Sequence, residues 1–184
     1  MKVKPKKCKV CKTEFRAFNS LHVFCSGECA IAHSKKVQEK RVKKVASEKR
    51  KAYREAKEKL KTRSEWMSSA QKAVNAYIRK RDEKLPCISC GRYHQGQYHA
   101  GHYRTVGGNP ELRFEELNIH KQCSPCNNHL HGNIVNYRIG LRDKIGDEKL
   151  EWLEGKHEPK HYTIDDLREI EKTYKLKLKE LEAK

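Results

Sequence analysis

The chain has 184 residues, of which 36% are hydrophobic, and its formal net charge at neutral pH is +18. This low apolar content argues against one large core and favours small domains that need a metal or disulfide staple. No apolar run is long enough to span a bilayer, and the amino terminus is a lysine run without the apolar region of a signal peptide, so we expect a cytoplasmic protein with no membrane partner.

The positive charge is concentrated in the first third of the chain. Residues 1–63 carry 21 Lys and Arg against 6 Asp and Glu, whereas residues 64–184 carry 21 against 18. A large field of one sign suits a polyanion, with nucleic acid as the first interpretation and an anionic membrane surface as the second. The basic stretch lacks large apolar residues to insert into lipid, which counts against the membrane.

Residues 1–34 are predicted to form an amino-terminal zinc-binding knuckle. Their two cysteine pairs are Cys8 with Cys11 and Cys25 with Cys29. Disulfides are the rival interpretation, but a reducing cytosol favours zinc held by thiolates. His22 or His33 could replace one cysteine, so the ligand set stays open. Four sulfurs would close the metal shell and leave no position for water, which predicts a structural site. The neighbouring lysines are candidate DNA contacts: Lys4, Lys6, Lys7, Lys9 and Lys12.

Residues 35–82 are predicted to form a basic helical arm followed by an amphipathic helix. Residues 35–63 lack Gly and Pro and hold 14 basic and 4 acidic side chains, which favours a helix. The large apolar residues make no clean stripe, so the segment is either a solvated linker or an arm lying along phosphates. Candidate phosphate contacts are Lys43, Lys44, Lys49, Arg50 and Lys51. Thr62-x-x-Glu65 is a capping box that predicts a second helix over 64–82.

Residues 83–146 form the predicted central module, and 147–184 the carboxy-terminal helices. Strands are expected over 96–103 and 117–122. Ser124 is predicted to cap a short helix that runs through His131, and Asn133 to cap the next helix. Residues 147–154 are expected to be helical. Thr163-x-x-Asp166 predicts the start of a final helix with an apolar stripe.

Two Cys-x-x-Cys pairs bracket the part of this module that carries the chemistry. They comprise Cys87 with Cys90 and Cys123 with Cys126, a set suited to a second structural zinc. Between and beyond them lie four polar side chains that we expect to face one point: His99, His102, Asn127 and His131. A neutral imidazole can take a proton from water, and a divalent cation can relieve the charge on a phosphate. The pattern predicts phosphodiester hydrolysis beside a zinc-held scaffold.

These residues carry a resemblance to known nucleases. Strand, loop, strand and helix, with a histidine on the first strand and Asn127 directly after Cys-x-x-Cys, resemble the HNH (ββα-metal) endonucleases and zinc-stapled phage Holliday-junction endonuclease VII. The motifs HAGHYR, NPELRF, QCSPCN and HGNIVNYR resemble the bacteriophage NinG family, also called Rap, over most of the chain. The implied fold is α+β: a zinc-stapled ββα-metal (HNH-like) module with an N-terminal zinc knuckle and flanking helices.

The resemblance also implies a function and roles for the site residues. It implies a metal-dependent, structure-selective DNA endonuclease that cleaves D-loops and Holliday junctions during phage recombination, in the host cytoplasm. His102 takes the place of the general base, and Asn127 that of the helix ligand. His99 stands where the superfamily often has a carboxylate. The catalytic cation, held by His99, Asn127 and His131, is Mg²⁺ or Mn²⁺, and the histidines leave its identity open.

Several alternatives remain open at this stage. Asn118 is either a cation ligand or a brace for the loop, and His131 either a ligand or a polar helix end. Arg104, Arg113 and Arg138 contact phosphate or form ordinary salt bridges. The rival functions are a non-catalytic zinc protein that binds branched DNA or bridges host or phage recombination proteins, and an RNA-binding zinc protein. Symmetric cleavage of a four-way junction would be simplest for a homodimer.

Overall fold

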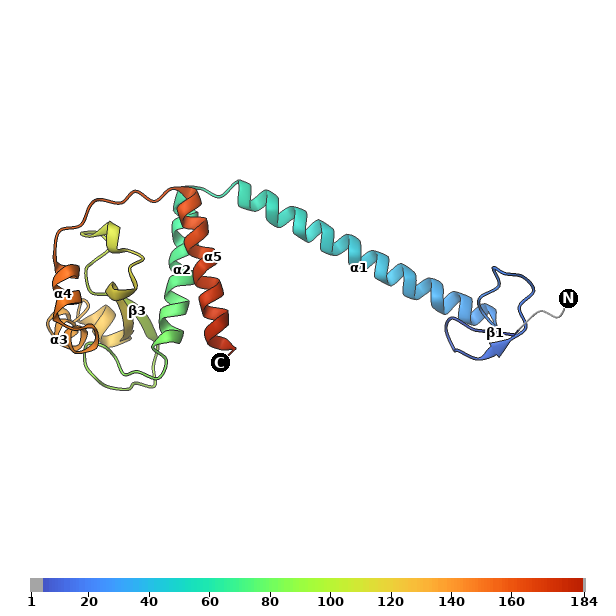
Figure 1. Ribbon diagram of the computed structural model, residues 1–184, viewed down its shortest axis with the longest axis horizontal. Helices are drawn as coiled ribbons and strands as arrows, with labels where there is room; N and C mark the ends of the chain where they lie inside the picture. The colour runs from blue at the N-terminus through green and yellow to red at the C-terminus, as the bar shows by residue number, and fades with distance from the viewer. Residues whose placement is uncertain (1–4, 184) are drawn as a thin grey trace. The chain divides into compact units, whose positions relative to one another are not determined.

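A computed structural model describes residues 5–183, and Lys4 therefore lies outside the described residues (Figure 1). The chain is a mixed α+β protein with two small two-stranded sheets. It divides after Leu60 into two compact units, each of which is described by itself. Within residues 5–183, no helix combines the length and the apolar content that crossing a bilayer requires.

The first unit is a small hairpin followed by one long helix. Strands β1 (Lys6–Lys7) and β2 (Glu14–Phe15) pair antiparallel. Helix α1 (Gly27–Lys59) begins earlier and ends earlier than the sequence predicted. It begins early because the Ser26 hydroxyl accepts a hydrogen bond from the Cys29 amide, which caps the first turn. No residue of α1 is buried.

The second unit is built around a helix pair and a hairpin. Its elements are α2 (Arg63–Arg81), β3 (Tyr98–His102), η1 (Pro110–Leu112), η2 (Glu116–Asn118), β4 (Ile119–Cys123), η3 (Pro125–His129), α3 (Ile134–Ile145), α4 (Asp147–Glu154) and α5 (Ile164–Glu182). Figure 1 shows α2 and α5 side by side. Both begin with the predicted capping boxes, formed by Thr62 with Glu65 and by Thr163 with Asp166.

The β3–β4 hairpin lies between two apolar clusters. On one side, Ile119 and Ala100 pack against the core that α2 and α5 share, which includes Val74, Ile78 and Leu167. On the other side, the buried hydroxyl of Tyr137 in α3 donates to the Gly101 carbonyl over 2.9 Å. The hairpin is therefore held from both faces.

The segment after β4 differs from the prediction. The helix does not continue through His131, because a π-type turn with Leu130 N–H donating to Pro125 C=O ends at His129. His131 and Asn133 then adopt left-handed φ values of 47° and 45°. Ser124 and Asn133 occupy the predicted N-cap positions of η3 and α3, but neither side chain accepts a backbone hydrogen bond there.

A buried carboxylate ties three elements of this unit together. Asp82, 2% exposed, accepts hydrogen bonds from the Lys121 amide, from both ends of the Arg81 guanidinium and from Lys144 in α3. Although burial opposes it, contacts from His120, Arg81 and Lys144 hold the pKa of Asp82 well below its usual range. Burial also lowers the pKa of the His120 imidazole. The network is a neutral His and a carboxylate shared by two cations.

We expect Asp82→Asn to destabilise the second unit by about 3–5 kcal/mol, because it removes the ion-pair partner of Lys144 and the nearer of the two carboxylates that pair with Arg81. In the wild type, stability should be highest above pH 6.5. It should fall as the pH drops through 6.5, where the unfolded chain protonates His120, and again below 3.8, where it protonates Asp82. Urea unfolding across pH measures both effects. Asp143→Asn, at an exposed side chain, is the control. Equal stability of the two variants would contradict this account.

Candidate functional site

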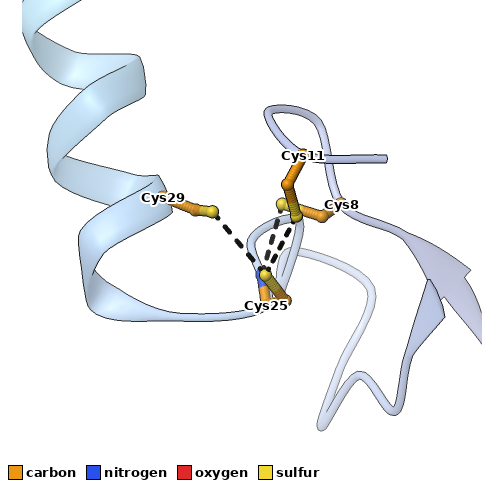
Figure 2. A group of neighbouring side chains, drawn as sticks. All are labelled: Cys8, Cys11, Cys25 and Cys29. Carbon is orange, nitrogen blue, oxygen red and sulfur yellow. Dashed lines mark hydrogen bonds between the residues drawn. The ribbon is translucent and has the colours of Figure 1, made fainter. Parts of the chain in front are cut away.

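The amino-terminal sulfur cluster is a closed four-cysteine set (Figure 2). Cys25 Sγ lies 3.4 Å from Cys11 Sγ and 3.6 Å from Cys29 Sγ, and the Cys25 amide donates to Cys8 Sγ. All four sulfurs lie within 4.8 Å of one another. Tetrahedral zinc with Zn–S bonds of about 2.3 Å needs sulfurs about 3.8 Å apart, so the set fits that ion.

Neither histidine near this cluster belongs to it. The His22 ring packs against Phe15 and Phe18, and the His33 ring against Phe24. Although burial opposes it, backbone hydrogen bonds lower the pKa of the Cys8 thiol to about 6, which favours the thiolate that binds metal. Among the described residues, the candidate ligands brought together here are thus the four cysteines.

The second cluster fastens the hairpin to the segments on either side of it. Cys87, Cys90, Cys123 and Cys126 place their sulfurs within 4.8 Å of one another, and Cys90 Sγ lies 3.9 Å from Cys123 Sγ. The Cys123 amide donates to Cys87 Sγ over 3.3 Å. His94 Nε2 lies 3.3 Å from Cys90 Sγ, so its ring is a direct neighbour of the cluster. These sulfurs could also hold zinc.

The two histidines of β3 project to opposite faces of the hairpin. In the antiparallel register His99 faces Gln122 and His102 faces Ile119, and residues three apart on a strand point in opposite directions. His99 Nε2 lies 3.5 Å from the Asn128 amide in η3. His102 Nε2 lies 3.0 Å from the Arg113 carbonyl. The expectation that both rings face one point is therefore wrong, while their catalytic roles stay predictions.

Two side-chain oxygens converge beside Gly101 on the His99 face. Gln122 Oε1 and Asn127 Oδ1 both lie within 3.1 Å of the point that a Cβ on Gly101 would occupy. Gln122 is fully buried; its amide donates to Ser89 Oγ at 2.6 Å and to the Gly132 carbonyl at 2.5 Å, while its own oxygen has no partner within residues 5–183. An orphaned buried oxygen beside a second amide oxygen suits a hard cation such as Mg²⁺ or Mn²⁺.

Gln122 was not among the cation ligands predicted from the sequence, whereas His131 was. Gln122 gave no motif signal, although a glycine inside a strand, here Gly101, often marks a close approach of another group. His131 is exposed and follows the end of η3, so it does not share a helical face with Asn127. Its role as a cation ligand stays a prediction without support from this geometry.

We expect Gly101→Ala to destabilise the second unit by about 1–3 kcal/mol, because the new methyl group overlaps the pinned Gln122 amide. The control is Gly96→Ala, where nothing lies within 4 Å of the added Cβ. Thermal melting of both variants measures the difference. Equal melting temperatures of Gly101→Ala and Gly96→Ala would contradict the close packing around Gln122.

The His102 imidazole is oriented and kept neutral. A carbonyl only accepts hydrogen bonds, so Nε2 carries the proton donated to Arg113 O, and Nδ1 holds the free lone pair. Nδ1 has no hydrogen-bond partner in the described part of the chain. Burial lowers the pKa of His102, so the ring is neutral at pH 7. A neutral ring with one fixed and one free nitrogen has the form that a general base requires.

Asn118 and the three candidate arginines all have partners inside the protein. Asn118 is fully buried; it accepts from the Arg104 amide and donates to two carbonyls, which makes it the loop brace rather than a ligand. The Nε atoms of Arg104 and Arg113 donate to Asn109 and Gln71. Arg138 forms a two-point pair with Glu154 at 2.7 and 2.9 Å.

The candidate phosphate contacts on α1 are all exposed. Lys44 Nζ lies 3.9 Å from Glu48 Oε1, and Lys51 Nζ lies 3.9 Å from Glu55 Oε1. The other three, Lys43, Lys49 and Arg50, form no ion pair with any described residue. Exposed pairs of this kind contribute little, so the charge of the helix stays available to a polyanion.

Comparison with known proteins gives one family. The family model described as Bacteriophage Lambda NinG protein matches residues 1–184. "Protein ninG" of Escherichia phage 933W is 42% identical over 187 residues, which cover 96% of this chain and 93% of that protein. The proteins of the same name from Escherichia phage lambda and Salmonella phage P22 are 51% and 49% identical over 122 residues, each covering 66% of this chain and 60% of the relative. No solved structure matches the chain.

Proposed function

The chain belongs to the bacteriophage lambda NinG family, and we propose that it is a metal-dependent endonuclease that cuts branched DNA. The observation that carries the proposal is the imidazole of His102, which is neutral, oriented through Nε2 and free at Nδ1. In this role His102 takes the proton from the attacking water at Nδ1. The Arg113 carbonyl fixes the tautomer and stabilises the imidazolium that results.

Residues on the other face of the hairpin would hold the cation. Asn127 and Gln122 offer oxygens beside Gly101, and His99 lies on the same face. When bound, Mg²⁺ or Mn²⁺ would neutralise charge on the phosphate and on the departing oxygen. Gly101, beside which these oxygens converge, directly precedes His102 at the end of β3, so the proposed base and the proposed cation site belong to the same strand end but lie on opposite faces of the hairpin. The order of strand, loop, strand and helical turn supports an HNH-like module, in which Gln122 would be an added oxygen donor.

Branched DNA is the proposed substrate because residues 5–183 offer strong positive charge and, among them, no element shaped to read bases. Helix α1 carries 12 Lys and Arg against 5 Glu, so it would supply affinity through phosphates. Selectivity would come from the shape of the branch. Each phosphate neutralised along α1 would steepen the logarithmic salt dependence of binding by about 0.9.

The test is cleavage of end-labelled D-loops, four-way junctions and linear duplex, with Mg²⁺ and separately with Mn²⁺. The proposal predicts cleavage of the branched substrates in at least one of these ions and little cleavage of the linear duplex. Equal cutting of all three substrates would refute branch selectivity. Binding to junctions with no cutting in either ion would refute the nuclease.

One observation favours a second function, a non-catalytic zinc protein that binds branched DNA or bridges recombination proteins. The His102 ring and the Asn127 oxygen, which comes from η3, lie on opposite faces of the hairpin, an arrangement less suited to catalysis than to a rigid DNA-binding scaffold. The same assay separates the two functions, because only the second predicts binding without any cleaved product.

A further inference from the structure

Helix α1 has 33 residues and none is buried, although long helices in proteins owe most of their stability to packing. The sequence suggested no clean apolar stripe, but one line of positions along α1, with small or apolar side chains at most of them, recurs at alternating steps of four and three residues. This seam consists of Ile31, Lys35, Gln38, Val42, Val45, Lys49, Ala52 and Ala56. Its large members, Ile31, Val42 and Val45, are 57%, 58% and 44% exposed. Alternating four and three is the spacing of a coiled-coil seam.

The opposite face of α1 carries most of its positive charge. In the heptad that places Val42 at position a and Val45 at position d, the outward positions b, c and f hold eight Lys and Arg. These are Lys36, Lys40, Lys43, Lys44, Arg50, Lys51, Arg54 and Lys57. The helix therefore presents a weakly apolar seam on one side and a basic stripe on the other.

We propose that α1 pairs antiparallel with α1 of a second copy of this chain. A parallel pair would set Lys35 and Lys49 against the same residues of the partner inside the seam, where like charges repel. An antiparallel pair centred between Val42 and Val45 avoids this. It sets Val42 against the partner's Val45, Lys49 against the partner's Gln38 and Lys35 against the partner's Ala52.

The residues that flank the seam favour the same direction. In the antiparallel alignment Arg41 and Glu48 occupy g positions at the same level, so Arg41 meets the partner's Glu48, twice by symmetry. In a parallel pair Arg41 would meet the partner's Ala46, and Glu48 the partner's Tyr53. Charge complementarity thus indicates that the partner on this seam is α1 of a second copy of the chain, and that the two helices run antiparallel. Both basic stripes remain outside and free for phosphates.

The pairing is tested by a charge swap in the full-length, zinc-loaded chain, with sedimentation equilibrium over a wide concentration range. Arg41→Glu and Glu48→Arg should each weaken self-association about tenfold, because each creates two like-charged contacts. The double variant R41E/E48R restores two opposite pairs and should return to within about threefold of the wild type.

The matched control is Arg54→Glu, which makes the same charge change on the outward face and should not weaken association. Circular dichroism of every variant checks that helix content is unchanged. A monomeric wild type, single variants that associate like the wild type, or a double variant as weak as the singles would each overturn the pairing. None of these outcomes depends on nuclease activity.

Discussion

Cys123→Ser is expected to abolish zinc binding by the second unit and to destabilise its fold by several kcal/mol. Cys123 is fully buried at the end of β4, and its amide also donates to Cys87 Sγ. Metal binding in structural zinc sites of small domains contributes apparent free energies of about 10–16 kcal/mol at neutral pH. A hydroxyl in place of the thiolate removes one of four ligands and leaves a polar group in an apolar cluster of cysteines.

The measurement is bound zinc by elemental analysis, together with thermal melting. The wild type should hold zinc in both clusters and the variant only in the amino-terminal one. Cys11→Ser is the matched control, because it should release the other ion and leave the second unit folded. Undiminished zinc and an unchanged melting temperature in Cys123→Ser would contradict a structural role for this cluster.

His102→Ala is expected to lower the rate of branched-DNA cleavage by about 10²–10⁴ while leaving affinity for the junction unchanged. The alanine removes the only described group that we assign to proton transfer and touches none of the basic face of α1. Single-turnover cleavage and a binding titration at matched salt measure the two effects separately. The control is His129→Ala, which changes an exposed ring that is not assigned to the cation site, and this variant should cleave DNA at the wild-type rate.

The pH dependence of the wild type sharpens this prediction. Because burial lowers the pKa of His102, the ring stays neutral down to a pH below its ordinary value of 6.5. The cleavage rate should therefore hold through neutrality and decline only on the acidic side of 6.5. A rate that already falls between pH 8 and 7 would assign the base to another group.

Local signals in the sequence carried much of the fold. Cysteine pairs with two or three residues between their members predicted both sulfur clusters, because such spacing aims two sulfurs at one point. The two capping boxes marked the first turns of α2 and α5. These features depend on neighbours only a few residues away, and a single sequence displays them.

Features that depend on strand register or distant partners could not be read in the same way. The predicted strand over 96–103 already contained His99 and His102, and residues three apart on a strand point to opposite faces, so the expectation that both rings face one point conflicted with that strand. The π-type turn after Pro125 ended a helix that propensity would continue. The roles of Gln122 and Asp82 depend on hydrogen bonds with Ser89, Gly132 and Lys144, which lie up to 62 residues away in the sequence.

The proposed nuclease needs a cation beside Gly101 as well as an oriented His102, and manganese anomalous scattering tests the cation most directly. Crystals grown with Mn²⁺ and measured at the manganese and zinc absorption edges would separate the two metals. We predict manganese bound by Asn127 Oδ1 and Gln122 Oε1, with zinc confined to the two sulfur clusters. Zinc in both sulfur clusters, with manganese only at sites away from the β3–β4 hairpin, would contradict it.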